Sequence, residues 1–470
     1  MATLKKARRQ HIRTTKNRKN DVDATWTPFR AAEKKYKARY PPLDLTGVLD
    51  LTREETTTRV GTSSEGTGIY TLATVPGVFY GYSSTAHSFD TGLVLLPSFV
   101  SPQVQHTLVR WALRDHARHP NETNLDAHYV LPPEGLWNAH LASLSTDTQL
   151  PLIVPKASEC TTGTSTAGPR ALTANDAASK TNLLSLQALP KPPPDPSPTV
   201  HACTPSELVP KLRWANIGWS YHWGTKQYDF PKGRGHVDAR LRDLCRHAVN
   251  SVPWEKVFGE GEGSVEGWGD DDWRTWNETY DPDAGIVNFY QTKDTLMAHV
   301  DRSEVCATSP LVSISLGNAA IFLIGGLTRD VEPVPILLRS GDVIIMSGPA
   351  CRRAYHADAH IHPLFHDERI GVPRILDNTL PEHFSYPHEQ PCTRTAEHGG
   401  DCVTECECKN ADLHGATAAS AFHPDAAAVM AEAKAWEPYR SYLKNARINV
   451  NVRQVFPKGF VPGASDHHDR

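Results

Sequence analysis

The chain contains a short pattern, His-x-Asp, that can supply two ligands to one metal ion. His-x-Asp puts an imidazole and a carboxylate two positions apart, and a second His elsewhere can complete a set of three. Two imidazoles and one carboxylate on one face of an Fe(II) ion leave the opposite positions open for reactants, as in non-haem iron oxygenases. The pattern alone says little, because it occurs five times, starting at His236, His299, His356, His423 and His467.

The surrounding sequence separates these copies. A predicted strand over 285–290 precedes His299, and the two clearest predicted strands follow it. His356 comes after another apolar strand and a glycine turn, where it can supply the distal ligand. His356 and Asp358 are an alternative near pair, but no comparable set of strands with a later His follows them. The sequence therefore predicts a metal-binding catalytic centre made of His299, Asp301 and His356.

A second requirement of such a centre is a cation for a dicarboxylate co-substrate. The guanidinium group suits this role because its planar fork pairs with a carboxylate through two hydrogen bonds. Arg447 and Arg453 are six residues apart in a stretch that alternates apolar and polar residues. The period of two places both arginines and Asn449 on one face of a predicted strand. An arginine pair on a strand is usually at the surface, but here the other face is apolar and covers a core.

The predicted elements agree with a sandwich of short strands. Apolar or alternating stretches bounded by glycine turns are typical of strands in antiparallel sandwiches and jelly rolls. They lie at 285–290, 310–316, 320–324, 336–338, 343–346 and 448–455, and a short apolar stretch lies at 92–97. A helix is expected from Ser101 to about Arg118, because Ser101-Pro102 forms a good N-terminal cap.

Composition limits the partners. The chain has 470 residues, 39% of them hydrophobic, and a formal net charge of −4, which argues against a uniformly basic nucleic-acid binder. Residues 1–40 nevertheless hold 13 Lys or Arg against 3 acids. Such a segment is either a solvated disordered arm, a phosphate-contacting arm, or a nuclear or mitochondrial targeting signal. No long apolar run is present, so we expect an intracellular protein without a membrane span, in the nucleus, the mitochondrion or both.

Four cysteines cluster late in the chain, at Cys392, Cys402, Cys406 and Cys408, with His398 and His414 nearby. They could supply the ligands of a tetrahedral zinc site. Their spacing is not the common paired C-x2-C, and reduced thiols in a loop are the simpler interpretation.

The combined motifs resemble the AlkB family of Fe(II)/2-oxoglutarate nucleic-acid dioxygenases, and in particular its homolog 1 branch. The matching residues are Asn288-Phe-Tyr290, His299-Val-Asp301, His356 and Arg447-Ile-Asn449-Val-Asn-Val-Arg453. The resemblance implies an α+β protein built on a double-stranded β-helix (jelly roll) with flanking helices and long irregular insertions. It also implies that the three metal ligands bind iron, that Asn288, Tyr290, Arg447, Asn449 and Arg453 hold 2-oxoglutarate, and that Trp219, Tyr228 and Arg352 contact the substrate.

The implied activity is oxidative demethylation of bases in nucleic acid, with O2 consumed and succinate, CO2 and formaldehyde released. The homolog 1 branch points first to 1-methyladenosine in tRNA and second to methylated DNA, as in DNA repair. A histone-directed oxygenase and a non-catalytic nucleic-acid-binding module are the alternatives. One departure matters: the bacterial member has an acid two residues after the ligand Asp, where this chain has Ser303, so base preference does not transfer.

From these patterns we expect five parts. They are a basic, disordered arm (1–40), an N-terminal helical extension (41–155), a flexible Ser/Thr/Pro-rich insertion (156–210), a dioxygenase domain (211–456) with a Cys/His-rich insertion at about 357–435, and a polar tail (457–470).

Overall fold

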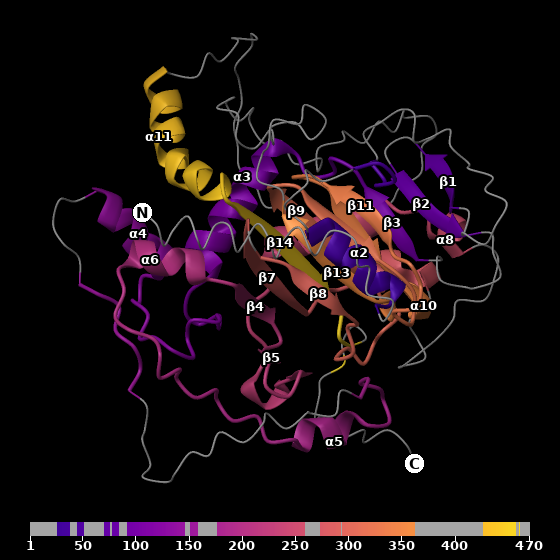
Figure 1. Ribbon diagram of the computed structural model, residues 1–470, viewed down its shortest axis with the longest axis horizontal. Helices are drawn as coiled ribbons and strands as arrows, with labels where there is room; N and C mark the ends of the chain where they lie inside the picture. Colours follow the sequence, from indigo (N-terminus) through magenta and orange to yellow (C-terminus); the bar gives the residue numbers. More distant parts are fainter. Residues whose placement is uncertain are drawn as a thin grey trace, which may run out of the picture. The chain divides into compact units, whose positions relative to one another are not determined.

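Two antiparallel sheets form the centre of the protein in its computed structural model (Figure 1). The structure describes residues 26–37, 45–50, 70–75, 78–83, 92–145, 151–157, 176–258, 273–292, 294–361, 426–456 and 460. By its internal contacts the chain divides into two units, one made of residues 1–377 and 438–470 and the other of residues 378–437.

The larger sheet has eight strands in the order β1-β2-β3-β12-β9-β14-β7-β4, and the smaller has four in the order β11-β10-β13-β8. Their bounds are β1 Tyr70–Val75, β2 Val78–Ser83, β3 Leu93–Leu96, β4 Trp214–Gly218, β7 Ala284–Gln291, β8 Leu296–His299, β9 Leu311–Gly317, β10 Ala320–Ile324, β11 Val334–Leu338, β12 Val343–Met346, β13 His356–Ile361 and β14 Ala446–Arg453. From β7 to β14 the chain passes repeatedly between the two sheets, and every strand pairing is antiparallel. This arrangement of antiparallel sheets with helices fits the jelly-roll oxygenase fold that the sequence predicts.

Side chains from both sheets meet in a shared core. Leu311 and Met346 of the large sheet pack in one buried cluster with Phe322 and Ile336 of the small sheet. All five residues of β10 are buried, because its alternate residues point into this cluster and onto the opposite face. A strand buried on both faces reads as a continuous apolar run, which is how 320–324 stands out in the sequence.

Helices and a short hairpin make up the remaining elements of the described chain. They are α2 Pro28–Lys37, α3 Pro102–Arg110, the π-helix η2 Trp111–His116, α4 Leu136–Ser145, α5 Leu183–Ala188, α6 Pro205–Leu208, η3 Val209–Lys211, the hairpin β5 Tyr221–His222 and β6 Gln227–Tyr228, η4 Phe230–Lys232, α7 Ala239–Asn250, α8 Trp254–Phe258, η5 Trp273–Thr275, α9 Trp276–Thr279, α10 Gly348–Arg352 and α11 Ala426–Leu443. The helix predicted after Ser101 is present, and the Ser101 side chain accepts a hydrogen bond from the Val104 N–H. No helix in the described part of the chain has both the length and the apolar character to cross a bilayer.

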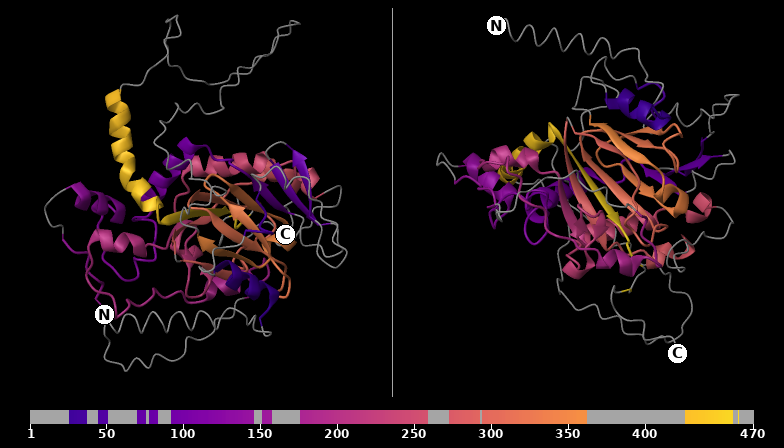
Figure 2. Two further views of the ribbon diagram at one scale, coloured as in Figure 1. Left: turned by 45° about the horizontal axis from the view of Figure 1, so that its top comes forward. Right: turned by 60° about the horizontal axis from the view of Figure 1, so that its bottom comes forward.

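Helix α2 corrects the prediction of a disordered arm over 1–40. Phe29 and Tyr36 are buried in a cluster with Ile321 and Leu323, on the outer face of the small sheet. Both views of Figure 2 show α2 against the strands of that sheet. The sequence prediction counted the charge of this segment and missed its apolar residues at helical spacing. The arm before residue 26 lies outside the described residues.

Two other predicted boundaries also change. The segment 41–155 is not only helical, since β1, β2 and β3 extend the large sheet through the pairing of β3 with β12. Residues 176–210, expected as part of a flexible insertion, carry the short helices α5 and α6, and a few of their side chains are buried. Ala178 and Leu183 join a buried cluster with Tyr228 and Phe456. A Ser/Thr/Pro-rich composition concealed these few apolar anchors.

Candidate metal and co-substrate site

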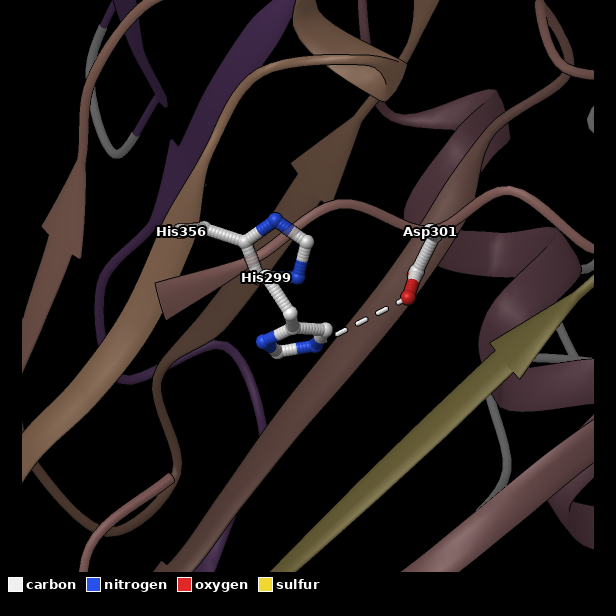
Figure 3. A group of neighbouring side chains, drawn as sticks. All are labelled: His299, Asp301 and His356. Atoms are coloured by element: carbon white, nitrogen blue, oxygen red, sulfur yellow. Dashed lines mark ion pairs between the residues drawn. The ribbon is translucent and has the colours of Figure 1, made fainter. Parts of the chain in front are cut away.

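The three predicted metal ligands lie together between the sheets. His299 ends β8, His356 begins β13, and the two residues are direct partners in the β8–β13 pairing. Asp301 follows two residues after His299, on the loop that leaves β8. One ligand atom from each of the three residues lies within 4.8 Å of the other two. Figure 3 shows the side chains converging, with His299 Nε2 3.7 Å from Asp301 Oδ1. The predicted choice of His299 and His356 among the His-x-Asp copies agrees with this geometry.

The histidines are oriented by their own backbone. Nδ1 of His299 lies 3.0 Å from the carbonyl oxygen of Met297, and Nδ1 of His356 lies 3.1 Å from that of Ala354. A carbonyl only accepts, so each Nδ1 carries the proton and donates, which leaves the lone pair of each Nε2 for a metal. This arrangement is typical of metal-binding histidines.

Electrostatics keep the ligands in their metal-binding protonation states. Burial lowers the pKa of His356 to about 4, assisted by the neighbouring His299, so its imidazole is neutral at physiological pH. Burial would raise the pKa of the Asp301 carboxyl, but the positive charge of Arg453, followed by the two histidines, outweighs it. The pKa of Asp301 therefore lies well below its usual range. Two imidazoles and a carboxylate suit Fe(II) and other divalent transition metals.

The predicted 2-oxoglutarate residues share one face of the large sheet. In the strand register, Arg447 of β14 lies beside Tyr290 of β7, and Asn449 lies beside Asn288. Because side chains alternate along a strand, these four residues and Arg453 point to the same side. That side faces the small sheet and the metal ligands, since Arg453 contacts Asp301 and the negative charge of Asp358 on β13 acts on Tyr290.

Arg447 is the group in this set that most clearly calls for a ligand. Its side chain is 1% exposed, and only Nη2 makes a hydrogen bond, to Ser315 Oγ at 3.0 Å. Its Nε and Nη1 atoms are buried without a partner, and it forms no ion pair with any carboxylate of the described residues. Buried donors of a charged group are rarely left unpaired. A carboxylate end of 2-oxoglutarate can accept hydrogen bonds from both of these nitrogens. The residues present therefore fit the co-substrate.

Arg453 is engaged differently. One of its nitrogens, Nη1, lies 3.2 Å from Asp301 Oδ2 and 2.6 Å from Glu304 Oε1. The Glu304 side chain is 1% exposed and also lies 3.9 Å from Nη2 of Arg352. Arg453 thus supports the metal ligand directly, and Glu304 links it to a second buried arginine.

The predicted substrate residues are less directly placed. Arg352 is 1% exposed and donates from Nε to the Ser309 carbonyl, so it belongs to the Glu304 cluster and does not line an open surface. The Tyr228 hydroxyl donates to Glu304 at 3.2 Å. Trp219 packs edge-on against Phe230 and Phe456. All three side chains thus pack against other parts of the protein, and their contact with a substrate stays a prediction.

Several residues near the site have no place in the sequence-based prediction. The Tyr221 hydroxyl lies beside Ser303, and burial raises the pKa of Tyr221 to about 12. Glu33 of α2 accepts a hydrogen bond from the Ala298 N–H at 2.7 Å, next to the ligand His299. Arg353 donates to the Asp301 carbonyl at 2.9 Å. Glu304 follows the ligand pair closely enough to have been suspected, whereas Glu33 becomes visible only once α2 is in place. The four clustered cysteines lie outside the described residues.

Comparison with known proteins agrees with this geometry. A family model of the 2OG-Fe(II) oxygenase superfamily matches residues 169–453, and the chain belongs to that superfamily. The match spans the metal ligands and both arginines of β14.

Within the superfamily, the resemblance to the AlkB family and its homolog 1 branch is confirmed. The chain is 32% identical over 257 residues to the human "Nucleic acid dioxygenase ALKBH1", covering 53% of this chain and 48% of the human protein. It is 28% identical over 359 residues to "tRNA demethylase abh1" of Schizosaccharomyces pombe, covering 76% and 87%. It is 29% identical over 252 residues to "DNA N(6)-methyladenine demethylase ALKBH1A" of Arabidopsis thaliana, covering 53% and 51%. The alignments span about half the length of the human and plant relatives.

Proposed function

We propose that this protein is an Fe(II)- and 2-oxoglutarate-dependent dioxygenase that removes methyl groups from bases in nucleic acid. The observation that carries the proposal is the pairing of His299, Asp301 and His356 with a buried, unsatisfied Arg447 on the facing sheet. A metal site alone serves many reactions, but an adjacent buried cation that has no carboxylate partner among the described residues favours an anionic co-substrate. The family match adds the identity of that co-substrate.

The two histidines and Asp301 would hold the iron. The bound metal supplies the oxidising power for O2 chemistry at a C–H bond, while the protein provides binding, orientation and exclusion of competing reactions. One oxygen atom enters 2-oxoglutarate, which leaves as succinate and CO2. The other enters the N-methyl group, and the resulting N–CH2OH group loses formaldehyde and returns the unmethylated base.

The chain's own residues divide the remaining tasks. Arg447 binds the distal carboxylate of 2-oxoglutarate and Ser315 fixes its guanidinium group. Asn449, with its side-chain nitrogen 2.9 Å from Ser313 Oγ, together with Asn288 and Tyr290, shapes the neighbouring part of this face. Arg453 keeps the Asp301 carboxylate ionised and oriented.

Nucleic acid is the substrate that the relatives support, through the printed names of the human, yeast and plant proteins. We propose methylated tRNA, with 1-methyladenosine as the favoured base, and methylated DNA second. A base must leave its stack before it can approach a buried metal, which favours unpaired or structured regions. Exposed Lys226, Lys232 and Arg234 on and after the hairpin are available to contact phosphates, although Lys232 also pairs with Glu122 at 2.6 Å.

The segment 1–20, with eight Lys or Arg and no acid, supports the nucleus or the mitochondrion as the site of action. Imaging of the full chain and of a variant with these cations replaced by Gln tests this assignment. An unchanged distribution would argue against a targeting role.

The function is tested by measuring formaldehyde and succinate together. Purified protein with Fe(II), 2-oxoglutarate and O2 is offered tRNA containing 1-methyladenosine, methylated DNA, methylated histone, and the unmethylated form of each. We expect equimolar products with methylated nucleic acid, and none with His299→Ala. Products formed only with histone would favour the protein-directed alternative. If His299→Ala kept nucleic-acid binding and the biological effect, the chain would be a non-catalytic module.

A further inference from the structure

Trp223 stands out on the surface of the described residues. It lies in the turn of the β5–β6 hairpin and is 45% exposed, and it is the one aromatic residue among the exposed large apolar side chains there. Single exposed apolar residues are common and need no explanation. Trp223 differs because its ring is held: the Trp214 ring lies 5.2 Å away at 34°, and the Tyr221 ring lies edge-on at 5.0 Å. Two sides of the indole are fixed while another remains open to solvent.

The position of Trp214 connects this pair to the co-substrate face. β4 is the last strand of the large sheet, and Trp214 is the register partner of Asn288, which is in turn the partner of Asn449. Paired residues of neighbouring strands point to the same side of a sheet. Asn449, Asn288 and Trp214 therefore lie in a row across three strands, and Trp214 is the last residue of that row. The Trp214–Trp223 pair therefore stands at the free edge of the face that holds the 2-oxoglutarate residues.

The hairpin is also tied to the metal loop. Ser303, two residues after the ligand Asp301, donates from its hydroxyl to the Lys226 carbonyl at 3.2 Å. Lys226 has a positive φ of 57°, a conformation that non-glycine residues seldom adopt. On the other side, the Tyr221 ring contacts Tyr228, whose hydroxyl donates to Glu304. These contacts hold the hairpin, and with it Trp223, at a fixed place beside the metal site.

The charge around the pair suits a polyanion. Lys226 is exposed, and its ammonium group has no acidic partner within the described part of the chain. Arg213, next to Trp214, has a side chain that is 43% exposed and shares its charge with Asp294 at 3.4 Å. An exposed aromatic ring with cations nearby in the chain is a combination that binds single-stranded nucleic acid, with bases stacking on the ring and phosphates contacting the cations.

We propose that Trp214 and Trp223 form a stacking platform for an unpaired base that neighbours the target nucleotide. The target base itself must reach the metal ligands, and Tyr221 lies between Trp223 and the loop that carries Asp301 and Ser303. The platform thus takes an adjacent base of the same strand, and it selects single-stranded or looped regions over a continuous duplex. This inference rests on the proposed action on nucleic acid and adds to it a second contact point.

The test is a fluorescence anisotropy titration with a labelled, unmethylated single-stranded ribo-oligonucleotide and with a fully paired duplex of the same sequence. The proteins are wild type, Trp223→Ala, Trp223→Phe and Leu144→Ala, the last removing an exposed apolar side chain from α4. Loss of one base stack should weaken single-strand binding by about 5- to 150-fold in Trp223→Ala. Trp223→Phe should keep most of the affinity, and Leu144→Ala and all duplex affinities should be unchanged. Circular dichroism of each variant confirms the fold.

Equal single-strand affinity in wild type and Trp223→Ala would overturn the platform, as would equal losses with Leu144→Ala or with the duplex, or an absence of single-strand binding in wild type. The assay needs no turnover. If Trp223-dependent binding is found but no methylated nucleic acid yields formaldehyde, the proposed demethylation fails while the platform stands.

Discussion

The two arginines of β14 have very different surroundings, although they lie on one face of one strand. Arg447 is buried with two nitrogens that lack a partner. Arg453 is buried against two carboxylates, Asp301 and Glu304. A buried unpaired cation lowers the stability of a free protein, whereas a buried paired cation is needed to compensate the charges beside it. We therefore expect Arg447 to bind a ligand. Arg453 instead stabilises the fold and holds a metal ligand, Asp301.

This difference sharpens the prediction that both arginines hold 2-oxoglutarate. We propose that Arg453 lies near the metal end of the co-substrate, and its observed contact is with Asp301. Arg447 leaves both Nε and Nη1 without a partner among the described residues, whereas Arg453 leaves Nε alone and contacts two carboxylates through Nη1. Substitution by Met should consequently lower the stability of the protein at Arg453, whereas at Arg447 it should weaken 2-oxoglutarate binding without lowering stability.

The largest effect is expected from Arg453→Met. It leaves the buried Glu304 with the Tyr228 hydroxyl and, at 3.9 Å, Arg352 Nη2, and it removes the charge that keeps the pKa of Asp301 low. Breaking a buried ion pair costs about 3–5 kcal/mol of unfolding free energy. Denaturant unfolding of the metal-free protein measures this loss, and a Co(II) titration should show weaker metal binding. Unchanged stability would mean that the Arg453 cluster contributes nothing to the fold.

Arg447→Met should act on the co-substrate instead. Truncating the protein partner of a buried charge pair costs about 2–5 kcal/mol of binding, or roughly 30-fold or more in Kd. The metal-free protein should be as stable as wild type or more stable, because an unpaired buried cation is gone. Kinetics at varied 2-oxoglutarate and unfolding measurements test both parts.

The matched control is Arg339→Met, which removes a guanidinium paired with Asp50 at 2.7 Å away from the metal ligands. It should lose stability and keep its affinity for 2-oxoglutarate. Loss of co-substrate affinity in both variants would show that the effect of Arg447→Met is not local.

The stability of the folded protein should also depend on pH near neutrality, because Asp283 lies beside the residues that follow Arg453. Burial raises the pKa of Asp283 to about 7, although its carboxylate accepts the N–H groups of Val455 and Phe456, just after Arg453. Between the ordinary pKa of about 4 and this value, the folded protein binds more protons than the unfolded chain, so its stability falls as pH rises. The slope from this one group is at most about 1.4 kcal/mol per pH unit. Comparing melting temperatures of wild type and Asp283→Asn from pH 5 to 7.5 should show this slope only in wild type.

Ser315→Ala should weaken 2-oxoglutarate binding less than Arg447→Met does. Its hydroxyl accepts from Arg447 Nη2, and removing one such bond costs about 0.5–1.5 kcal/mol. We expect a few-fold increase in the KM for 2-oxoglutarate with kcat unchanged. A change in kcat alone would indicate that Ser315 acts on the chemical step and not on Arg447.

Much of the site could be predicted because its residues lie on or next to strands whose apolar and polar residues alternate clearly. His299 was separable from the other His-x-Asp copies by the strands around it, and the period of two placed Arg447, Asn449 and Arg453 on one face. The strand 343–346 was predicted with its observed bounds, since a short apolar run between turns has few other structures available to it.

The remainder depends on contacts between distant parts of the chain. Glu33 and Ala298 are 265 residues apart, and no local pattern joins them. Trp223 was passed over because a tryptophan in a polar turn carries no periodic signal, and the contact of Arg352 with Glu304 is visible only in the fold. The helix α2 and the buried side chains of 176–210 were hidden by charge and composition, which describe a segment's average and not its few anchoring side chains.

The most direct test of the account is a calorimetric titration of 2-oxoglutarate into wild type and His299→Ala, each with and without Co(II) as a redox-stable substitute for iron. The arrangement of three ligands opposite Arg447 predicts that wild type binds 2-oxoglutarate tightly only when the metal is present, and that His299→Ala does so in neither condition. Equal binding with and without metal, or equal binding in His299→Ala, would contradict a joint site for iron and 2-oxoglutarate between the two sheets.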